Sequence, residues 1–182
     1  MNILNELKSK FNIAEPIFDY EIEQMGYSVS DIEDTIKSGV FEELNGVDFI
    51  PCRIFYLVGY SEFTGSNIIL YRNSLSLIEK YFIGDDFEFG CYSGLTLQNK
   101  LGLSTQVPSK LSIQSNRTTD IIDNEYFYII PNTSYKRSDF NYICLAEILN
   151  FNGDMEYDLS KTLKELNSKC KDKSKLEKYI KR

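Results

Sequence analysis

The chain has 182 residues and a net charge of −7, and 42% of its residues are hydrophobic. This composition is sufficient for one packed domain, or for a small domain joined to a medium one. Histidine is absent and the four cysteines form no CxxC pair, so Ser–His and Cys–His catalysis is excluded and a zinc site is disfavoured.

Several further functional classes find no support in the sequence. It contains neither a GxxxxGK[ST] nor a GxGxxG motif, either of which would hold a nucleotide on a glycine-rich loop. No apolar run approaches the roughly 20 residues needed to cross a bilayer, and the first ten residues lack the basic-then-apolar order of a signal peptide. We therefore expect a cytoplasmic protein that is not an enzyme, has no cofactor or metal, and does not enter a membrane.

Residues 1–52 are predicted to form a small domain that begins with three helices. Apolar residues at helical spacing between positions 3 and 11 predict the first helix. Pro16 is expected to open the second helix, because a proline at the first helical position sacrifices no hydrogen bond. Ser28 or Ser30 is expected to cap the third helix, in which apolar residues recur every four positions up to Val40.

A hairpin is predicted to complete this domain. Asn45-Gly46 is the strongest hairpin signal in the chain, and it would join residues 41–44 to residues 47–50. Three helices followed by a hairpin is the order of a winged helix-turn-helix. Three short helices are also common as simple scaffolding, so the pattern alone leaves both interpretations open.

The charge of residues 1–52 argues against DNA binding. Three lysines stand against eleven acidic residues, a net charge of −8, and the expected recognition helix itself carries Asp31, Glu33 and Asp34. Because sequence-independent DNA affinity comes from cations that neutralise phosphates, such a helix repels the duplex. If the domain does bind DNA, the side chains expected nearest the groove are those of Tyr27, Ser28, Ser30 and Lys37.

Residues 53–151 are predicted to form a mixed α/β domain of nearly balanced charge, with eight basic and ten acidic residues. The doublet of Asp85 and Asp86 is expected to be a solvated turn before a strand-like segment at 87–89. The aromatic residues 126–128 are more typical of core packing than of a stacking surface for nucleic acid. The predicted elements are strands at 54–58 and 126–130 and helices at 75–82 and 142–149.

The segment 92–116 is predicted to be a short helix, a turn and a strand. Ser93 is expected to cap the helix through its hydroxyl group, and Gly102 is expected to end it in the left-handed conformation. Pro108 stops any continuation of the helix, and the alternation at 110–114 predicts the strand. The segment offers no nucleophile, metal ligand or phosphate cradle, so a structural corner is its simplest interpretation.

This segment carries the run SGLTLQNKLGLSTQVP and resembles the AbiEi-type antitoxins of bacterial type IV toxin–antitoxin systems, which act in abortive infection. Their core run is SGLTxxNxLGLTTQVP, followed by a strand. The resemblance implies a winged helix-turn-helix at the start of the chain, an apolar helix after the core strands and a basic helical tail. The matching residues are Ser93, Gly94, Leu95, Thr96, Asn99, Leu101, Gly102, Leu103, Thr105, Gln106, Val107 and Pro108.

The resemblance also implies a function. Antitoxins of this family oppose a nucleotidyltransferase toxin encoded alongside them, and they do so without a stable complex with the toxin. Autoregulation by operator binding belongs to the same pattern. The acidic first domain of this chain departs from that last property and makes DNA binding doubtful.

Residues 152–182 are predicted to form a helical tail, packed on the second domain or extending from it. From Phe151 to Arg182 the chain has nine basic and six acidic residues, a net charge of +3. Lysines on exposed helical faces are commonly only solvated; the alternative is a surface for an acidic partner. The basic residues are Lys161, Lys164, Lys169, Lys171, Lys173, Lys175, Lys178, Lys181 and Arg182.

These patterns together predict an α+β protein with a winged helix-turn-helix at 1–52, a mixed α/β domain at 53–151 and a C-terminal helical tail at 152–182. The favoured function is that of an antitoxin-like regulator, which would also act as a transcriptional autorepressor if its first domain binds DNA. Two alternatives stay open. One is a stand-alone winged-helix transcription regulator, and the other is a protein-interaction module that does not bind DNA.

Overall fold

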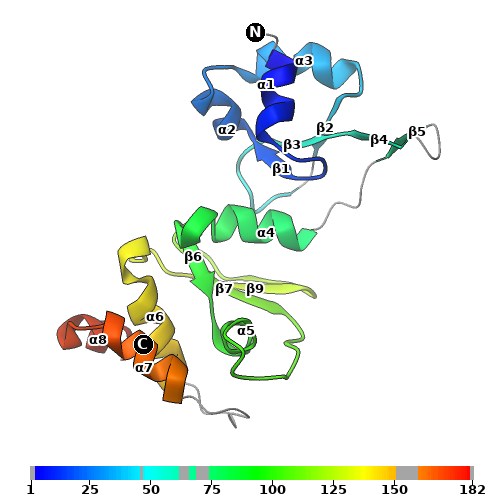
Figure 1. Ribbon diagram of the computed structural model, residues 1–182. Coiled ribbons are helices and arrows are strands. Elements are labelled where there is room, and N and C mark those ends of the chain that lie inside the picture. Colours follow the sequence, from blue (N-terminus) through cyan, green and yellow to red (C-terminus); the bar gives the residue numbers. More distant parts are fainter. Residues whose placement is uncertain (1–2, 46, 62–65, 69–73, 151–159, 181–182) are drawn as a thin grey trace. The chain divides into compact units, whose positions relative to one another are not determined.

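The computed structural model describes residues 3–45, 47–61, 66–68, 74–150 and 160–180 (Figure 1). The chain divides into two compact units, which we call the first unit (Met1–Ile78) and the second unit (Glu79–Arg182). Both contain helices and short strands, so the fold class is mixed α+β. Within the described ranges, no helix has the length and the apolar character that crossing a membrane requires.

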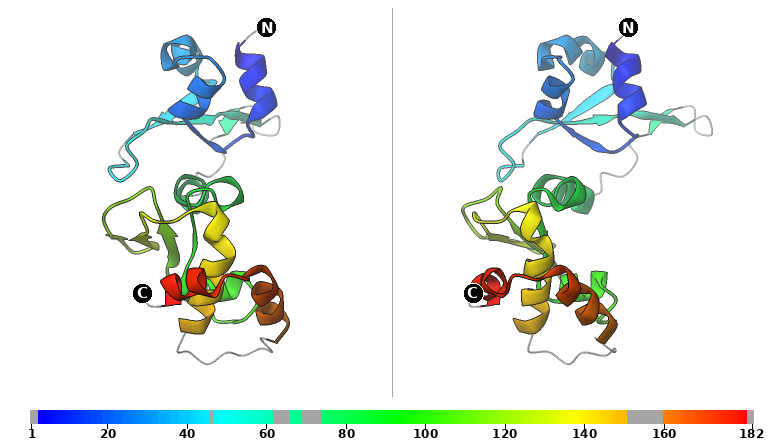
Figure 2. Two further views of the ribbon diagram at one scale, coloured as in Figure 1. Left: turned by 90° about the vertical axis from the view of Figure 1, so that its left-hand side faces the viewer. Right: turned by 60° about the vertical axis from the view of Figure 1, so that its left-hand side comes forward.

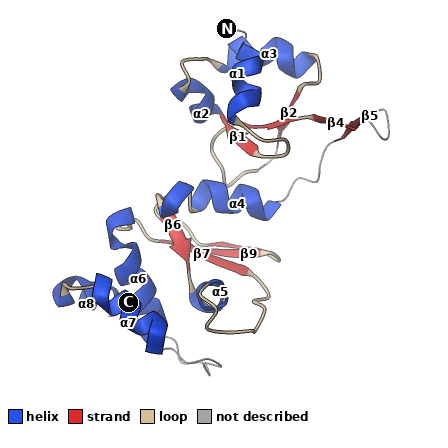
Figure 3. Ribbon diagram, viewed as in Figure 1, coloured by secondary structure: helices blue, strands red, loops and turns tan. Residues whose placement is uncertain are grey.

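The first unit packs short helices on an antiparallel sheet (Figure 3). Its elements are α1 (Ile3–Lys10), β1 (Pro16–Phe18), α2 (Asp19–Gln24), α3 (Val29–Lys37), β2 (Phe41–Leu44), β3 (Ile54–Leu57), β4 (Gly59–Ser61) and β5 (Ser66–Ile68). The order β1-β3-β2 makes β3 the central strand, and β4 and β5 form a separate two-stranded ribbon. Helix α4 (Ser74–Phe82) contains the division between the units.

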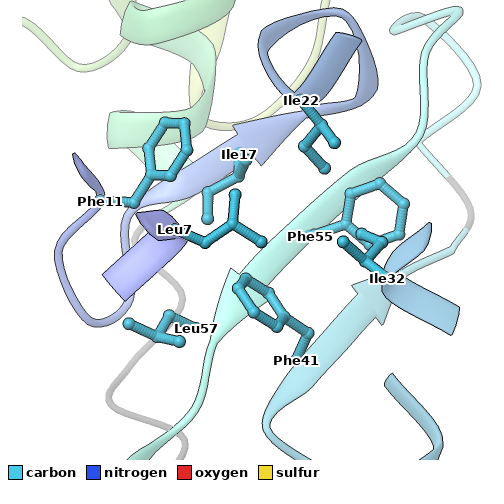
Figure 4. Packing of buried hydrophobic residues seen from close by; sticks show 8 residues of the cluster. All are labelled: Leu7, Phe11, Ile17, Ile22, Ile32, Phe41, Phe55 and Leu57. Carbon is cyan, nitrogen blue, oxygen red and sulfur yellow. The ribbon is translucent and has the colours of Figure 1, made fainter. Parts of the chain in front are cut away.

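One apolar cluster joins α1, α2 and α3 to the sheet (Figure 4). Each of its eight side chains is at most 6% exposed. Burying a side chain of this size contributes about 1.5–3 kcal/mol, so the cluster accounts for much of what holds the first unit together. Its members are Leu7, Phe11, Ile17, Ile22, Ile32, Phe41, Phe55 and Leu57.

The prediction that Pro16 opens a helix is wrong. Pro16, Ile17 and Phe18 form β1, in which all three residues are buried and pair with β3, and α2 begins only at Asp19. Proline is tolerated as the first residue of an edge strand because no ladder hydrogen bond depends on its missing N–H. Burying these three residues against β3 outweighs the local preference of Pro16 for the start of a helix.

The predicted two-residue hairpin at Asn45-Gly46 is also wrong. Strand β2 pairs with β3 and not with residues 47–50, and Phe41 stands opposite Leu57. All four residues of β3 are buried, whereas only Ile50 is buried among residues 47–50, so pairing with β3 covers more apolar surface. Gly46 itself lies outside the described residues.

Strand β3 also moves the expected domain boundary. We expected the first domain to end at residue 52, but β3 lies beyond that position and pairs with both β1 and β2. The division between the units falls after Ile78 instead. The first unit is therefore longer than 1–52, because its sheet is incomplete without its central strand.

The second unit is built on a four-stranded sheet of order β6-β7-β9-β8, in which β7 and β9 are parallel and the other pairs are antiparallel. Its elements are the 3₁₀ turns η1 (Asp85–Phe87) and η2 (Arg137–Asp139), the strands β6 (Gly90–Tyr92), β7 (Leu111–Ser115), β8 (Ile122–Asp123) and β9 (Phe127–Pro131), and the helices α5 (Gly94–Lys100), α6 (Phe140–Asn150), α7 (Ser160–Lys169) and α8 (Lys173–Ile180). The predicted helices at 75–82 and 142–149 and strands at 54–58, 110–114 and 126–130 correspond to α4, α6, β3, β7 and β9.

The strand expected at 87–89 is wrong, because the strand of this region is β6 and begins at Gly90. A Cβ atom at Gly90 would overlap the carbonyl oxygens of Phe82 and Gln114, so only glycine lets β6 lie this close to its neighbours. Asp85 and Asp86 are exposed in η1, as predicted for a solvated turn.

Helices α7 and α8 lie beside α6 (Figure 2). Leu166 and Cys170 join an apolar cluster with Cys144 and Leu145 of α6, and Tyr179 joins a second cluster with Ile143. The basic tail therefore packs on the second unit through its apolar edges and does not extend from it.

The predicted left-handed end of α5 is confirmed. Gly102 has a φ of +70°, its N–H donates to the Asn99 carbonyl at 3.0 Å, and the Leu103 N–H donates to the Gln98 carbonyl at 2.8 Å. These two bonds form a Schellman motif, and Leu103 folds back to become 2% exposed. Glycine therefore lets the chain turn from α5 toward β7.

Replacing Gly102 with Val should lower the free energy of unfolding by about 1–2 kcal/mol, because a residue with a Cβ atom resists the left-handed conformation. No atom lies within 4 Å of the new Cβ position, so the effect is conformational and not a clash. Urea unfolding measures it. The control is Gly102→Asn, which tolerates positive φ and should lose less, and an unchanged midpoint for Gly102→Val would contradict the explanation.

Candidate functional site

Thr96, in the segment that resembles the antitoxin run, joins helix α5 to strand β7. Its side chain is 2% exposed. The hydroxyl group accepts from the Ser112 N–H at 2.9 Å and donates to the Lys110 carbonyl at 3.3 Å. A buried hydroxyl that both donates and accepts fixes the angle between the two elements.

Asn99 holds the loop that follows α5. Its side-chain amide donates to the carbonyls of Ser104 and Gln106, at 3.2 and 3.4 Å. Beyond this brace, Thr105 and Gln106 are exposed and Val107 is 86% exposed. The side chains of Thr96 and Asn99 are thus committed to structure, and the exposed loop 105–107 is accessible to a partner.

The expected hydroxyl cap of Ser93 is wrong. Ser93 occupies the N-cap position of α5, but its side chain makes no capping hydrogen bond. Glu147 of α6 takes that role, because its Oε2 accepts from the Gly94 N–H at 3.0 Å and its Oε1 accepts from the Gln114 amide at 3.2 Å. Glu147 lies 53 residues further along the chain, so no local pattern pointed to it.

Three of the four residues expected nearest a DNA groove are engaged within the first unit. The Tyr27 hydroxyl donates to Glu6 of α1 at 2.6 Å, and this hydrogen bond raises the pKa of Tyr27. The Ser28 hydroxyl lies 2.7 Å from both the Ser30 hydroxyl and the Asp31 carboxylate. Hydrogen bonds from the Ser28 side chain and backbone lower the pKa of Asp31, so the start of α3 carries a negative charge.

The fourth residue, Lys37, lies between two carboxylates of its own helix. Its Nζ atom is 3.8 Å from Glu33 and 3.8 Å from Asp34. Beside the sheet, Arg53 makes a bidentate contact with Glu43, with N–O distances of 2.7 and 2.8 Å, and this contact lowers the pKa of Glu43. These cations are paired with acidic neighbours, so the face of α3 remains acidic.

The basic residues of α7 and α8 fall into two groups. Lys175 forms an ion pair with Asp139, and Lys169 lies 2.8 Å from Glu165. Lys181 and Arg182 lie outside the described residues. The remaining lysines are exposed, either on the two helices or in the short link that joins them: Lys161, Lys164, Lys171, Lys173 and Lys178.

Asp139 anchors α8 to the second unit. It is 4% exposed, and it accepts hydrogen bonds from the Tyr179 hydroxyl at 2.6 Å and from the Ser138 hydroxyl at 3.0 Å, in addition to the Lys175 ammonium group. Burial acts to raise the pKa of Asp139, but the hydrogen bonds from Lys175, Tyr179 and Ser138 outweigh it and hold the pKa below its usual range. An ionised carboxylate is therefore part of the docking of α8.

The four cysteines, all within the described residues, form no disulfide bond, and three of them, Cys91, Cys144 and Cys170, are buried. Burial raises the pKa of Cys91 and raises that of Cys144 to about 12, so these thiols are protonated and unreactive at neutral pH. In the described part of the chain, no group of three or more Cys, Asp or Glu side chains is placed to hold a metal ion.

Comparison with known proteins adds no relative: no protein-family model, curated protein or solved structure matches the chain. The structure brings together the predicted residues of the segment 93–108, and it adds Glu147 and Asp139, which the sequence reasoning missed. Glu147 is the one acidic residue of a mainly apolar helix, a signal that marks a carboxylate with a specific partner. Asp139 follows the polar residues 136–138, so no such signal marks it.

Replacing Asp139 with Asn should lower the free energy of unfolding at pH 7 by about 2 kcal/mol, because hydrogen bonds to a charged group are lost. The pKa of Asp139 is lower in the folded chain than its unfolded value of about 3.9. Its contribution is therefore present above pH of about 4 and is lost as the pH falls through the folded pKa. Urea unfolding at pH 7 and pH 3 should show a difference between wild type and variant that shrinks in acid.

The matched control is Asp85→Asn, at an exposed aspartate of η1, which should change stability little at either pH. An equal loss for Asp139→Asn at pH 7 and pH 3 would contradict the role of the ionised carboxylate.

Proposed function

We propose that the protein is an antitoxin-like regulator of a type IV toxin–antitoxin system and opposes a nucleotidyltransferase toxin. The segment 93–108 carries the proposal, because its run of residues resembles that of the AbiEi-type antitoxins. Several residues of the resemblance have a defined geometric role, since Thr96 joins α5 to β7, Asn99 braces the loop, and Gly102 ends the helix. A match in residues that determine a shape is a stronger argument than a match in solvated positions.

The element order of the first unit supports a winged helix-turn-helix. The elements α1, β1, α2, α3, β2 and β3 follow one another, and a β1-β3-β2 sheet packs against the helices, as expected for that fold. In such a domain α3 is the helix that would enter a DNA groove. This order is consistent with a regulator, whether or not it still binds DNA.

The acidic face of α3 favours a second candidate function, that of a protein-interaction module. Asp31, Glu33 and Asp34 lie on this helix, and its one lysine is close to two of them. A DNA duplex bound there would find few protein cations to replace the counterions on its phosphates, whereas a basic protein surface would be attracted. Under this alternative the first unit keeps the scaffold of a DNA-binding domain and uses it for a protein partner.

Growth rescue tests the antitoxin-like function. Expression of a nucleotidyltransferase encoded beside the gene is expected to arrest cells, and co-expression of the full chain is expected to restore growth. At equal soluble levels, Gly102→Asn should rescue better than Gly102→Val, because the second substitution opposes the corner on which the resemblance rests. Continued arrest in the presence of soluble wild-type protein would overturn the proposal.

Any affinity for duplex DNA should reside in the exposed lysines of α7 and α8 and not in α3. Replacing Lys164, Lys171 and Lys178 with Gln should reduce the slope of log affinity against log salt by about 2.7, since each phosphate contact contributes about 0.9. Fluorescence anisotropy at several salt concentrations measures the slope. Substitution is preferable to deletion, because Leu166 and Tyr179 of the same helices are buried in the core.

The control replaces the three lysines of residues 1–52 with Gln, which makes the same change in net charge in the first unit. Its affinity should be unchanged. Nanomolar binding to the protein's own promoter near physiological salt by the α7–α8 variant would mean that the first unit itself binds DNA.

A further inference from the structure

A cavity of about 230 Å³ lies within the second unit, at the carboxyl ends of the parallel strands β7 and β9. We call it the α6 cavity. Gln114 and Pro131 line it from the sheet, Ile143 and Glu147 from α6, and Tyr179 from α8. The carboxyl ends of parallel strands are a usual position for a ligand, because the chain opens there into loops.

A chain of hydrogen bonds leads to the carboxylate of this cavity. The Ser134 hydroxyl donates to Asn132 at 3.1 Å, Asn132 donates to Gln114 at 2.8 Å, and Gln114 donates to Glu147 at 3.2 Å. Gln114 and Asn132 are only 8% and 4% exposed, so their amides are fixed in orientation by these bonds. Gln114 and Asn132 thus form a polar wall of the cavity, and the chain of hydrogen bonds ends on Glu147.

In the part of the chain that the structure describes, neutral donors satisfy the Glu147 carboxylate. Its two oxygens accept from the Gly94 N–H and from the Gln114 amide, both neutral donors. Among the residues that the structure describes, no lysine or arginine forms an ion pair with Glu147. A carboxylate beside an apolar wall favours a positively charged partner.

The remaining walls determine what kind of cation fits. Ile130, Pro131, Ile143 and Ala146 present aliphatic surface, and the volume is below the roughly 300–1,000 Å³ of sites for drug-sized ligands. A divalent metal ion would need more carboxylate or carbonyl ligands than this single carboxylate provides. A short aliphatic body with one charged end matches both the apolar and the acidic wall.

We propose that the α6 cavity binds a small organic cation, with its ammonium or guanidinium group against Glu147 and its aliphatic body against Ile143 and Ala146. The proposal is independent of the antitoxin-like function. It adds a ligand-binding site to the second unit between the sheet, α6 and α8. Because Glu147 also accepts from the Gly94 N–H, occupancy would bear on the start of α5.

Titration of the ¹⁵N-labelled full chain with n-butylammonium chloride, followed by NMR, tests the proposal. Saturable shifts are expected for the Gly94 backbone amide and for the side-chain amides of Gln114 and Asn132. n-Butanol at equal concentration should give weaker and unsaturated shifts, and sodium chloride controls for ionic strength. This titration of the wild-type chain is decisive by itself: equal shifts with n-butanol, or no saturable shift with n-butylammonium, would overturn the proposal.

The Glu147→Gln variant removes the charge and keeps an oxygen that accepts from the Gly94 N–H. It should bind n-butylammonium about tenfold more weakly, because a charge-assisted contact is replaced by a neutral one. Glu125→Gln is the matched control, since Glu125 is exposed before β9 and outside the cavity, and its affinity should equal that of wild type. Undiminished binding by folded Glu147→Gln would also overturn the proposal.

Discussion

A helical segment that is apolar on every side must be covered on every side, and the middle of α6 is such a segment. Its residues from Ile143 to Ala146 are all buried, and α5, α7, α8 and the sheet each cover part of it. This requirement explains the C-terminal helices. Leu166 and Tyr179 complete the core, and apart from Lys175, which pairs with Asp139, the described lysines of the tail are exposed. The basic tail is therefore a surface of the second unit and not a free arm.

Glu147 is the one charged residue of α6, and its position follows from the same requirement. A carboxylate on a largely buried helix is stable only where hydrogen bonds satisfy it, and the Gly94 N–H and the Gln114 amide provide them. These two bonds link α6 to the start of α5 and to β7. The residue that fixes the corner is thus also the residue that gives the α6 cavity its charge, so the shape of the corner and the chemistry of the cavity depend on each other.

The sequence predicted the features that depend on neighbouring residues. The Schellman end at Gly102 and helix α6 are local, since glycine chemistry or apolar composition is enough to specify them. The errors share a different cause. Residues 16–18 form a strand, and residues 41–44 do not pair with residues 47–50. In both cases the reason is that the segment pairs with β3, which lies further along the chain. The cap of α5 comes from Glu147 for the same reason. Local propensity fails where a distant buried element offers more apolar area or a better acceptor.

Charge is separated between the units in a way that bears on the proposed function. Residues 1–78 contain five basic and twelve acidic residues, whereas residues 79–182 contain fifteen of each, with lysines concentrated on α7 and α8. Opposite surface charges select different partners, because like charges repel at an interface more strongly than opposite charges stabilise it. Under the proposed function, the acidic face of α3 would attract a basic protein surface, and the exposed lysines of α7 and α8 would attract an acidic one. If both contacts are made to one partner, each raises the effective concentration of the other, so neither needs to form a stable complex alone.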